Sequence, residues 1–223
     1  MPALLDLLVP PACAVCRAAG PLLCRRCIES LPLLDGPACA RCGAPAVRPV
    51  DDCAECRGRR LGFVSAAAAL RYDDEAARAL VHGLKDGGLR ALAVPAAGLM
   101  AMVVPRPDAD HLTWVPADPL RQALRGYHPP RLLAEELSLR WGIPARALLD
   151  GPLWRRPQRG LARDGRRRNV RCAFTGRAGV HGRVVLVDDV HTTGATLSAA
   201  ARALRAAGAE AVFAATLARA DDG

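Results

Sequence analysis

A short apolar run followed by two acids and a loop of small residues most constrains the fold of this 223-residue chain. Residues 184–187 are Val-Val-Leu-Val, and the three β-branched side chains among them predict a short buried strand. After the strand come Asp188 and Asp189, and then the loop residues Thr192, Thr193, Gly194, Ala195 and Thr196. Apolar residues at helical spacing begin at Leu197, and Gly208 lies where such a helix would end. The stretch therefore predicts a strand, a tight loop and a helix of an α/β fold.

This strand–loop–helix unit has the chemistry of a phosphate site. Backbone N–H groups of the loop converge near the start of the helix, whose dipole adds positive charge there. Asp188 and Asp189 would repel a phosphate, but they can accept hydrogen bonds from sugar hydroxyls or hold a hydrated magnesium ion. The sequence thus predicts a site for a ribose 5-phosphate. The alternative is an ordinary turn with two capping acids, which places two like charges together at some cost.

The stretch resembles the 5-phosphoribosyl 1-pyrophosphate (PRPP) signature of class I phosphoribosyltransferases. The resemblance implies that Asp188 and Asp189 bind the ribose hydroxyls with Mg²⁺, and that the loop from Thr192 to Thr196 binds the 5-phosphate. It also implies that a loop after an earlier strand holds pyrophosphate through backbone N–H groups. The candidates for that loop and its flank are Pro116, Ala117, Asp118, Arg121 and Arg125. The forked guanidinium groups of Arg121 and Arg125 would suit phosphate oxygens. The alternative is a proline-rich turn followed by arginines that are only solvated.

Eight of the nine cysteines lie before residue 57 as four Cys-x-x-Cys pairs: Cys13 and Cys16, Cys24 and Cys27, Cys39 and Cys42, Cys53 and Cys56. Each pair offers two thiolates to a tetrahedral Zn²⁺ ion, so four pairs fill two closed structural sites. Sequential grouping closes the shorter loops and is preferred, while cross-braced grouping stays open. Few apolar residues accompany these pairs, so metal binding would supply the folding energy. The alternatives are a nucleic-acid or partner-binding module, a structural module on the next domain, or an iron–sulfur cluster.

A change of composition near Leu61 predicts two domains, a zinc ribbon over 1–60 and a phosphoribosyltransferase-like domain over 61–223. Within the second domain the apolar patterns predict strands over 64–72, 112–115, 147–149 and 153–154, and helices over 75–84, 89–103 and 129–140. The second of these helices is expected to be interrupted near Pro95. Cys172 is predicted to be a small core residue, and His191 is predicted to fill space rather than act as a general base.

The formal net charge is +9, and 30 of the 31 basic residues are arginine, with Lys85 the one lysine. This charge favours ligands that carry phosphate, or nucleic acid. Residues 155–171 hold eight arginines and predict a flexible basic loop, with Gln158, Arg163, Arg168 and Asn169 as its candidate functional residues. The loop would close over pyrophosphate or follow a nucleic-acid backbone, or it is simply a solvated segment.

No run of residues approaches the about 20 apolar residues that span a membrane. The apolar N-terminus over 1–11 lacks a basic segment before it, so it predicts a short helix rather than a signal peptide. These observations predict a cytoplasmic protein.

Over nearly its whole length the chain resembles the ComF family, amidophosphoribosyltransferase-like proteins linked to natural DNA uptake. The resemblance rests on the four cysteine pairs, the acid-pair loop, Leu84-Lys85, Val115-Pro116, Arg125-Gly126-Tyr127, and the series Gln158, Leu161, Arg168, Asn169 and Phe174. Two departures stand out. His128 and Pro129 occupy positions where the family often has Asn-Gln, and residues 117–119 replace the second half of Val-Pro-Val-Pro.

The resemblance implies an enzyme that uses PRPP and Mg²⁺ to transfer a phosphoribosyl group to an unknown acceptor, in the setting of DNA uptake. The alternative is a protein that senses PRPP or a nucleotide without turnover. Such a protein would bind single-stranded DNA, or proteins of the DNA-uptake machinery, through the basic loop and the zinc ribbons. The sequence predicts no catalytic side chain, acceptor or oligomeric state.

Overall fold

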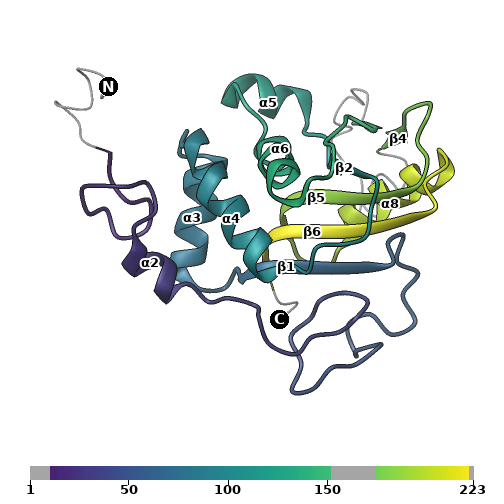
Figure 1. The fold of residues 1–223 in the computed structure, drawn as a ribbon, viewed down its shortest axis with the longest axis horizontal. Coiled ribbons are helices and arrows are strands. Elements are labelled where there is room, and N and C mark those ends of the chain that lie inside the picture. Colours follow the sequence, from purple (N-terminus) through teal and green to yellow (C-terminus); the bar gives the residue numbers. More distant parts are fainter. Residues whose placement is uncertain (1–10, 152–173, 221–223) are drawn as a thin grey trace, which may run out of the picture.

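A parallel sheet of four strands forms the centre of the structure, a computed structural model in which residues 11–151 and 174–220 are described (Figure 1). The strand order across the sheet is β1 (Ser65–Arg71), β6 (Ala211–Arg219), β5 (Arg183–His191) and β2 (His111–Trp114). All three neighbouring pairs are parallel. Two short antiparallel strands, β3 (Leu149–Asp150) and β4 (Thr175–Gly176), form a separate ladder. The predicted α/β fold with a parallel sheet is confirmed.

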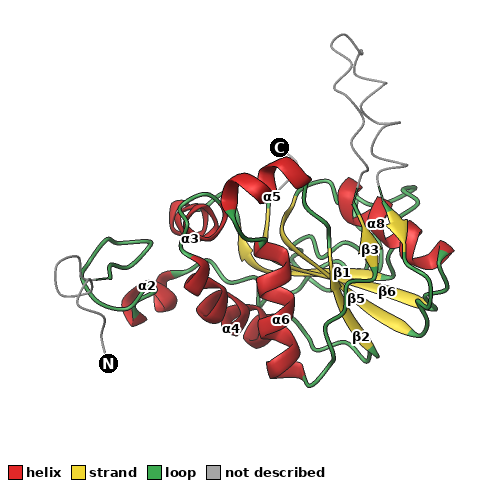
Figure 2. Ribbon diagram, turned by 90° about the horizontal axis from the view of Figure 1, so that it is seen from above, coloured by secondary structure: helices red, strands yellow, loops and turns green. Residues whose placement is uncertain are grey.

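Helices cover both faces of this sheet (Figure 2). The helices α3 (Glu75–Lys85), α4 (Ala93–Val103) and α6 (Pro129–Trp141) lie on one face, and α8 (Ala195–Ala206) lies on the other. Val185 and Val187 of β5 join the apolar cluster on the first face, whereas Val184 and Leu186 join the cluster that contains α8. Because both faces of β5 are covered, its run of residues is continuously apolar rather than alternating.

Local chemistry explains where several helices begin and end. The carboxylate of Asp74 caps α3 by accepting from the N–H groups of Ala76 and Ala77, at 2.8 and 3.2 Å. Pro129 opens α6, where a missing N–H costs nothing, and Gly142 follows the last residue of that helix with a φ of 67°.

Three short helices complete the described elements: α2 (Arg25–Ser30), the 3₁₀ turn η1 (Arg90–Leu92) and α5 (Pro119–Arg125). The predicted interruption of a helix near Pro95 is wrong. Pro95 lies in the first turn of α4, where an N–H has no partner inside the helix, so proline fits without a break. The helix instead changes from 3₁₀ to α geometry before Pro95, between η1 and α4.

The cysteine-rich segment runs along the free edge of β1. Leu34 N donates to Ala69 O at 2.9 Å, Arg71 N donates to Pro32 O at 3.0 Å, and Ala66 N donates to Arg41 O at 3.0 Å. These bonds satisfy the outer edge of a strand that would otherwise offer unpaired backbone groups. The two parts of the chain are therefore joined by direct hydrogen bonds, and the proposed boundary near Leu61 stays a prediction.

Among the described residues, no helix combines the length and the apolar character that crossing a bilayer requires. Four sequence predictions concern residues outside the described ones: the N-terminal helix, the strand at 153–154, the basic loop at 155–171, and the core position of Cys172.

Candidate functional site

The acid pair lies in the second half of β5, towards the carboxyl end of the sheet. Asp189 is 6% exposed, and Asp188 is half-buried. The backbone N–H of Asp189 donates to Asp188 Oδ1 at 2.9 Å, and the N–H of Val190 donates to Asp189 Oδ1 at 2.8 Å. Burial, followed by the charge of Asp189, raises the pKa of Asp188 well above its ordinary value. The structure thus brings together two carboxylates that gain stability from a nearby cation.

A lysine already supplies part of that positive charge. Lys85, at the end of α3, places its Nζ 3.1 Å from Asp189 Oδ2, and one third of the lysine side chain stays exposed. Sequence reasoning assigned no role to Lys85, although one signal pointed to it. It is the one lysine in a chain that otherwise uses arginine for every basic position, and the two side chains are not interchangeable.

The loop after the acid pair has the backbone geometry that a phosphate site needs. Gly194 is buried with a φ of 68°, a conformation that favours glycine, and α8 begins at the next residue. Thr192, Thr193 and Thr196 are exposed, and Thr193 Oγ1 accepts from Ala195 N at 3.3 Å. Within the described residues, no protein oxygen accepts from the backbone N–H groups of Thr192, Thr193 or Gly194. These three donors are available to a ligand at the start of a helix.

The loop predicted to hold pyrophosphate follows β2, with Pro116 and Ala117 half-buried beside Gly151. Asp118 has a structural role, because its Oδ1 accepts from Leu120 N at 2.9 Å at the start of α5. Arg121 lies on α5, which begins at Pro119, the last residue of the predicted loop.

Arg125, at the end of α5, reaches the neighbourhood of Lys85. Its Nη2 lies 2.6 Å from Asp86 Oδ1, and this arginine is the main partner that lowers the pKa of Asp86 against the opposing effect of burial. His128 is 7% exposed, and burial lowers its pKa to about 4, while the nearby charge of Asp189 acts in the opposite direction. Lys85 therefore contacts the acid pair directly, His128 is close enough to feel the charges of Asp189 and Arg125, and Arg125 is paired with Asp86 next to Lys85.

His191 is more than the space-filling residue that the sequence predicts. Its Nδ1 lies 2.9 Å from Thr216 Oγ1, and its Nε2 lies 2.9 Å from Nη1 of the buried Arg219. Burial, and then the charge of Arg219, lowers the pKa of His191 to about 4, so the ring is neutral and serves as a hydrogen-bonded support.

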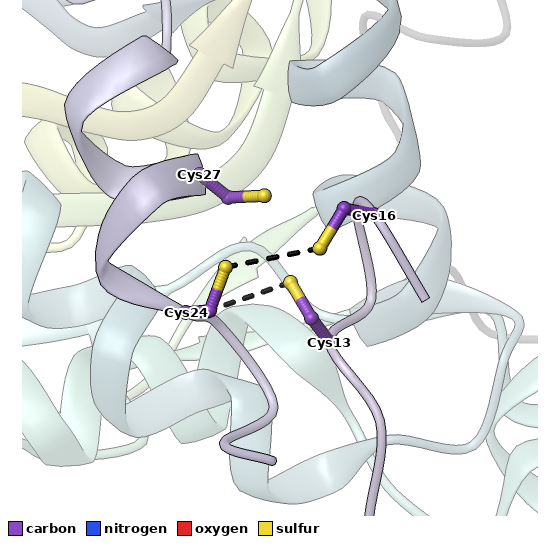
Figure 3. Close-up of side chains that lie close together, drawn as sticks. All are labelled: Cys13, Cys16, Cys24 and Cys27. Carbon is purple, nitrogen blue, oxygen red and sulfur yellow. Dashed lines mark hydrogen bonds between the residues drawn. The ribbon is translucent and has the colours of Figure 1, made fainter. Parts of the chain in front are cut away.

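The eight N-terminal cysteines form two groups of four, in the sequential order: Cys13, Cys16, Cys24 and Cys27, then Cys39, Cys42, Cys53 and Cys56. In the first group Cys16 Sγ and Cys24 Sγ are 3.8 Å apart, and Cys24 N donates to Cys13 Sγ at 3.5 Å (Figure 3). In the second group the three closest sulfur pairs are separated by 3.4, 3.6 and 3.8 Å. A tetrahedron with Zn–S bonds of about 2.3 Å has edges of about 3.8 Å, so both groups fit zinc.

Thiol chemistry also fits two metal ions. Burial raises the pKa of Cys27 to about 12, and neighbouring thiols add to this effect. Burial acts in the same direction on Cys13, but hydrogen bonds from backbone N–H groups, led by Cys16, outweigh it and lower that pKa to about 6. Four such thiols cannot all ionise beside one another unless a cation neutralises them. The two four-cysteine groups are consistent with two structural zinc ions.

The candidate residues of the basic loop, Gln158, Arg163, Arg168 and Asn169, lie outside the described residues. The assignments of the acid pair, the phosphate loop and the pyrophosphate loop to a ligand stay predictions.

Comparisons with known proteins agree with this architecture. Residues 4–57 match the model of a double zinc ribbon domain, and residues 180–223 match the model of a phosphoribosyl transferase domain. The chain is 38% identical over 111 residues to Competence protein F of Haemophilus influenzae, which covers 48% of each protein. It thus spans about half the length of this curated relative.

Solved structures show weaker likenesses. The chain is similar to a glutamine PRPP amidotransferase from B. subtilis, with 27% identity, a TM-score of 0.39, and coverage of 56% of this chain and 26% of that one. The adenine phosphoribosyltransferase of Leishmania tarentolae is 17% identical with a TM-score of 0.33, covering 57% of this chain and 71% of that one. Two segments of the chain thus match the two domain types that the sequence predicted, and about half of the chain is similar to Competence protein F.

Proposed function

We propose that this chain binds PRPP with Mg²⁺ at the carboxyl end of β5 and transfers the phosphoribosyl group to an acceptor. The observation that carries the proposal is the sequence of donors and acceptors after one strand. Two carboxylates at the end of β5, one buried and one half-buried, are followed, after two intervening residues, by three backbone N–H groups that no described protein oxygen accepts. The carboxylates match the ribose hydroxyls, and the N–H groups match the 5-phosphate.

Magnesium fits the acid pair. Carboxylate oxygens are the ligands that Mg²⁺ prefers. Burial, and then the charge of Asp189, raises the pKa of Asp188, and a bound cation would favour its ionised form. When bound, the metal would supply charge that neutralises pyrophosphate oxygens. Asp188 and Asp189 would hold it, and Lys85 keeps Asp189 oriented until then.

The chain's own basic groups would assist departure of pyrophosphate. In the transfer, the bond between the anomeric carbon and pyrophosphate breaks, the electron pair leaves with pyrophosphate, and the acceptor's electron pair forms the new bond. Lys85 contacts Asp189, and Arg125 pairs with Asp86, the residue after Lys85, so both positive charges are available near the acid pair. Their fixed positive charges favour the transition state, because they are in place before the charge develops. No described side chain is placed as a general base, so a proton on the attacking atom of the acceptor would leave to solvent water.

A role related to competence is part of the proposal. Its support is the 38% identity to a protein named Competence protein F, over about half of each chain. Binding of single-stranded DNA or of uptake-machinery proteins stays a prediction, since the basic loop on which it depends is outside the described residues.

Calorimetric titration of the full chain with PRPP, with and without Mg²⁺, tests the proposal. Wild-type protein is expected to bind PRPP only with the metal. Asp189→Asn should weaken this binding by about a hundredfold, or about 2.7 kcal/mol, because the variant loses a charged ligand oxygen.

Asp35→Asn is the matched control, because Asp35 is an exposed acid in the segment before β1. It should bind PRPP as the wild type does. The proposal is wrong if the wild type binds no PRPP, or if Asp189→Asn binds as tightly as Asp35→Asn while both variants unfold at the same temperature.

A further inference from the structure

The second group of cysteines lies against the candidate phosphate loop. Arg59 follows this group in sequence, and its Nη2 donates a hydrogen bond to the carbonyl oxygen of Thr193. Its Nη1 also donates to Glu55 O at 3.3 Å, which anchors the same side chain within the second ribbon, the segment of residues 39–59 that holds the second cysteine group. A small hollow lies between ribbon and loop, lined among others by Cys42, Arg59, Phe63, Thr192, Thr193 and Gly194. One guanidinium therefore connects the ribbon directly to the loop.

A buried arginine makes a second connection to the same ribbon. Arg219, at the end of β6, is 2% exposed, and its Nη1 lies 3.1 Å from Cys42 O and 2.9 Å from His191 Nε2. Its Nη2 pairs with the carboxylate of Glu55 in the ribbon. His191 is the residue directly before Thr192, so the start of the loop and Cys42, a candidate zinc ligand, are joined by the side chain of Arg219.

The contact of Arg59 has a geometric consequence for the loop. In a trans peptide, the C=O of one residue and the N–H of the next point in opposite directions. When Arg59 holds the Thr193 carbonyl, the N–H of Gly194 is therefore fixed on the opposite side of that peptide. This N–H is one of the three loop donors that no described protein oxygen accepts. Gly194 has no side chain to resist rotation, so an external restraint matters most at this peptide.

We propose that Arg59 of the second zinc ribbon is a positioning residue for the 5-phosphate site, because it orients the peptide between Thr193 and Gly194. The phosphate site is then shared by both parts of the chain. The ribbon contributes no atom that touches the phosphate, and its effect passes through the direction of one backbone N–H. This inference rests on the proposed function, since it concerns the same phosphate.

The test compares Arg59→Met with Arg48→Met in the full chain with zinc bound. Arg48 is an exposed arginine of the same ribbon, so the pair matches in charge, residue type and domain. Binding is measured by calorimetry with ribose 5-phosphate, with Mg²⁺ and PRPP, and with Mg²⁺ and pyrophosphate. Zinc content is measured in every sample and should stay at two ions per chain.

Arg59→Met should weaken the binding of both ribose 5-phosphate and PRPP by about tenfold, which is the effect of losing one well-oriented hydrogen bond. It should leave pyrophosphate binding unchanged, because that group lies at the other end of the ligand. Arg59→Lys keeps a donor and should recover part of the affinity, and Arg48→Met should match the wild type. A general loss of structure would instead weaken the binding of all three ligands together, and that outcome would contradict the inference.

Amide hydrogen exchange on the ligand-free protein gives an independent measurement. Peptides that contain Gly194 should exchange faster in Arg59→Met than in Arg48→Met, since the peptide has lost its restraint. Equal exchange overturns the inference whether or not PRPP binds. If the wild type binds PRPP and Arg59→Met binds it equally well, the inference fails while the proposed function stands. If the wild type binds no phosphate ligand, both fail.

Discussion

The two four-cysteine groups share their ligands but differ in how they join the rest of the molecule. In the first group, Cys13 and Cys27 belong to the large apolar cluster that also contains α3 and α4. Ala14 lies so close to α3 that a Cβ atom on Gly83 would be 3.4 Å from its methyl group. In the second group, the buried cysteines form a small cluster of their own, and polar contacts connect them to β1, Arg219 and the phosphate loop. Figure 1 shows the first group beside α3 and the second beneath β1.

This difference separates two uses of the same metal-binding unit. Apolar packing is non-directional and contributes stability in proportion to the area it buries. Hydrogen bonds such as those from Arg59 and Arg219 contribute less energy each, but they fix the direction of the groups that they join. The first ribbon is therefore expected to stabilise the fold, and the second is expected to determine the geometry of the ligand site.

Among changes to the two cysteine groups, loss of a metal ligand in the second group should have the largest effect on PRPP binding. Cys56 is fully buried, with its Sγ 3.6 Å from that of Cys39. We expect Cys56→Ser to lose one of two zinc ions and to weaken PRPP binding by roughly thirtyfold, about 2 kcal/mol, because the contacts of Arg59 and Arg219 are lost together. Metal analysis and calorimetry measure the two quantities. If Cys56→Ser bound PRPP as tightly as the wild type, the second ribbon would not determine the geometry of the ligand site, and the proposed difference between the two ribbons would be wrong.

A glycine in the second group allows its position to be disturbed without removing a ligand. A Cβ atom on Gly43 would lie 2.5 Å from the carbonyl oxygen of Ala66, a backbone atom of β1. Gly43→Ala must therefore move the ribbon away from the strand, and we expect about 2–3 kcal/mol lower stability and severalfold weaker PRPP binding.

Gly58→Ala is the matched control for this clash. Gly58 has a φ of 74°, close to the 70° of Gly43, but nothing lies within 4 Å of its added Cβ atom. It should cost about 1 kcal/mol in backbone strain and leave PRPP affinity unchanged. Denaturant unfolding measures the stability of Gly43→Ala and Gly58→Ala, and calorimetry measures their PRPP affinity. Equal behaviour of the two would show that contact with β1 does not position the ribbon.

Loss of a ligand in the first group should have the smallest effect on binding. Cys27→Ser should release one zinc ion and lower the stability of the protein, because Cys27 belongs to the main apolar cluster. We expect the PRPP dissociation constant to stay within about twofold of the wild type, since none of the described contacts joins this ribbon to the phosphate loop. A drop in affinity as large as that of Cys56→Ser would contradict the comparison.

The sequence by itself determined the elements whose signals are local. The apolar run before Asp188 predicted a strand covered on both faces, and the spacing of the cysteines predicted two metal sites with zinc geometry. These features are set by residues within a few positions of one another, where periodicity and ligand spacing are reliable. The acid pair and Gly194 were candidates for the same reason.

Only the tertiary structure decided which distant residues meet at the site. Lys85 lies 104 positions before Asp189 and Arg59 lies 134 positions before Thr193, yet each pair is in contact. Such meetings depend on strand order and on how a helix or ribbon docks, and no local pattern encodes them. The sequence did not predict helix α5 around Arg121 for a related reason: Asp118 caps it, and a cap is recognised only when the residues that follow are known to be helical.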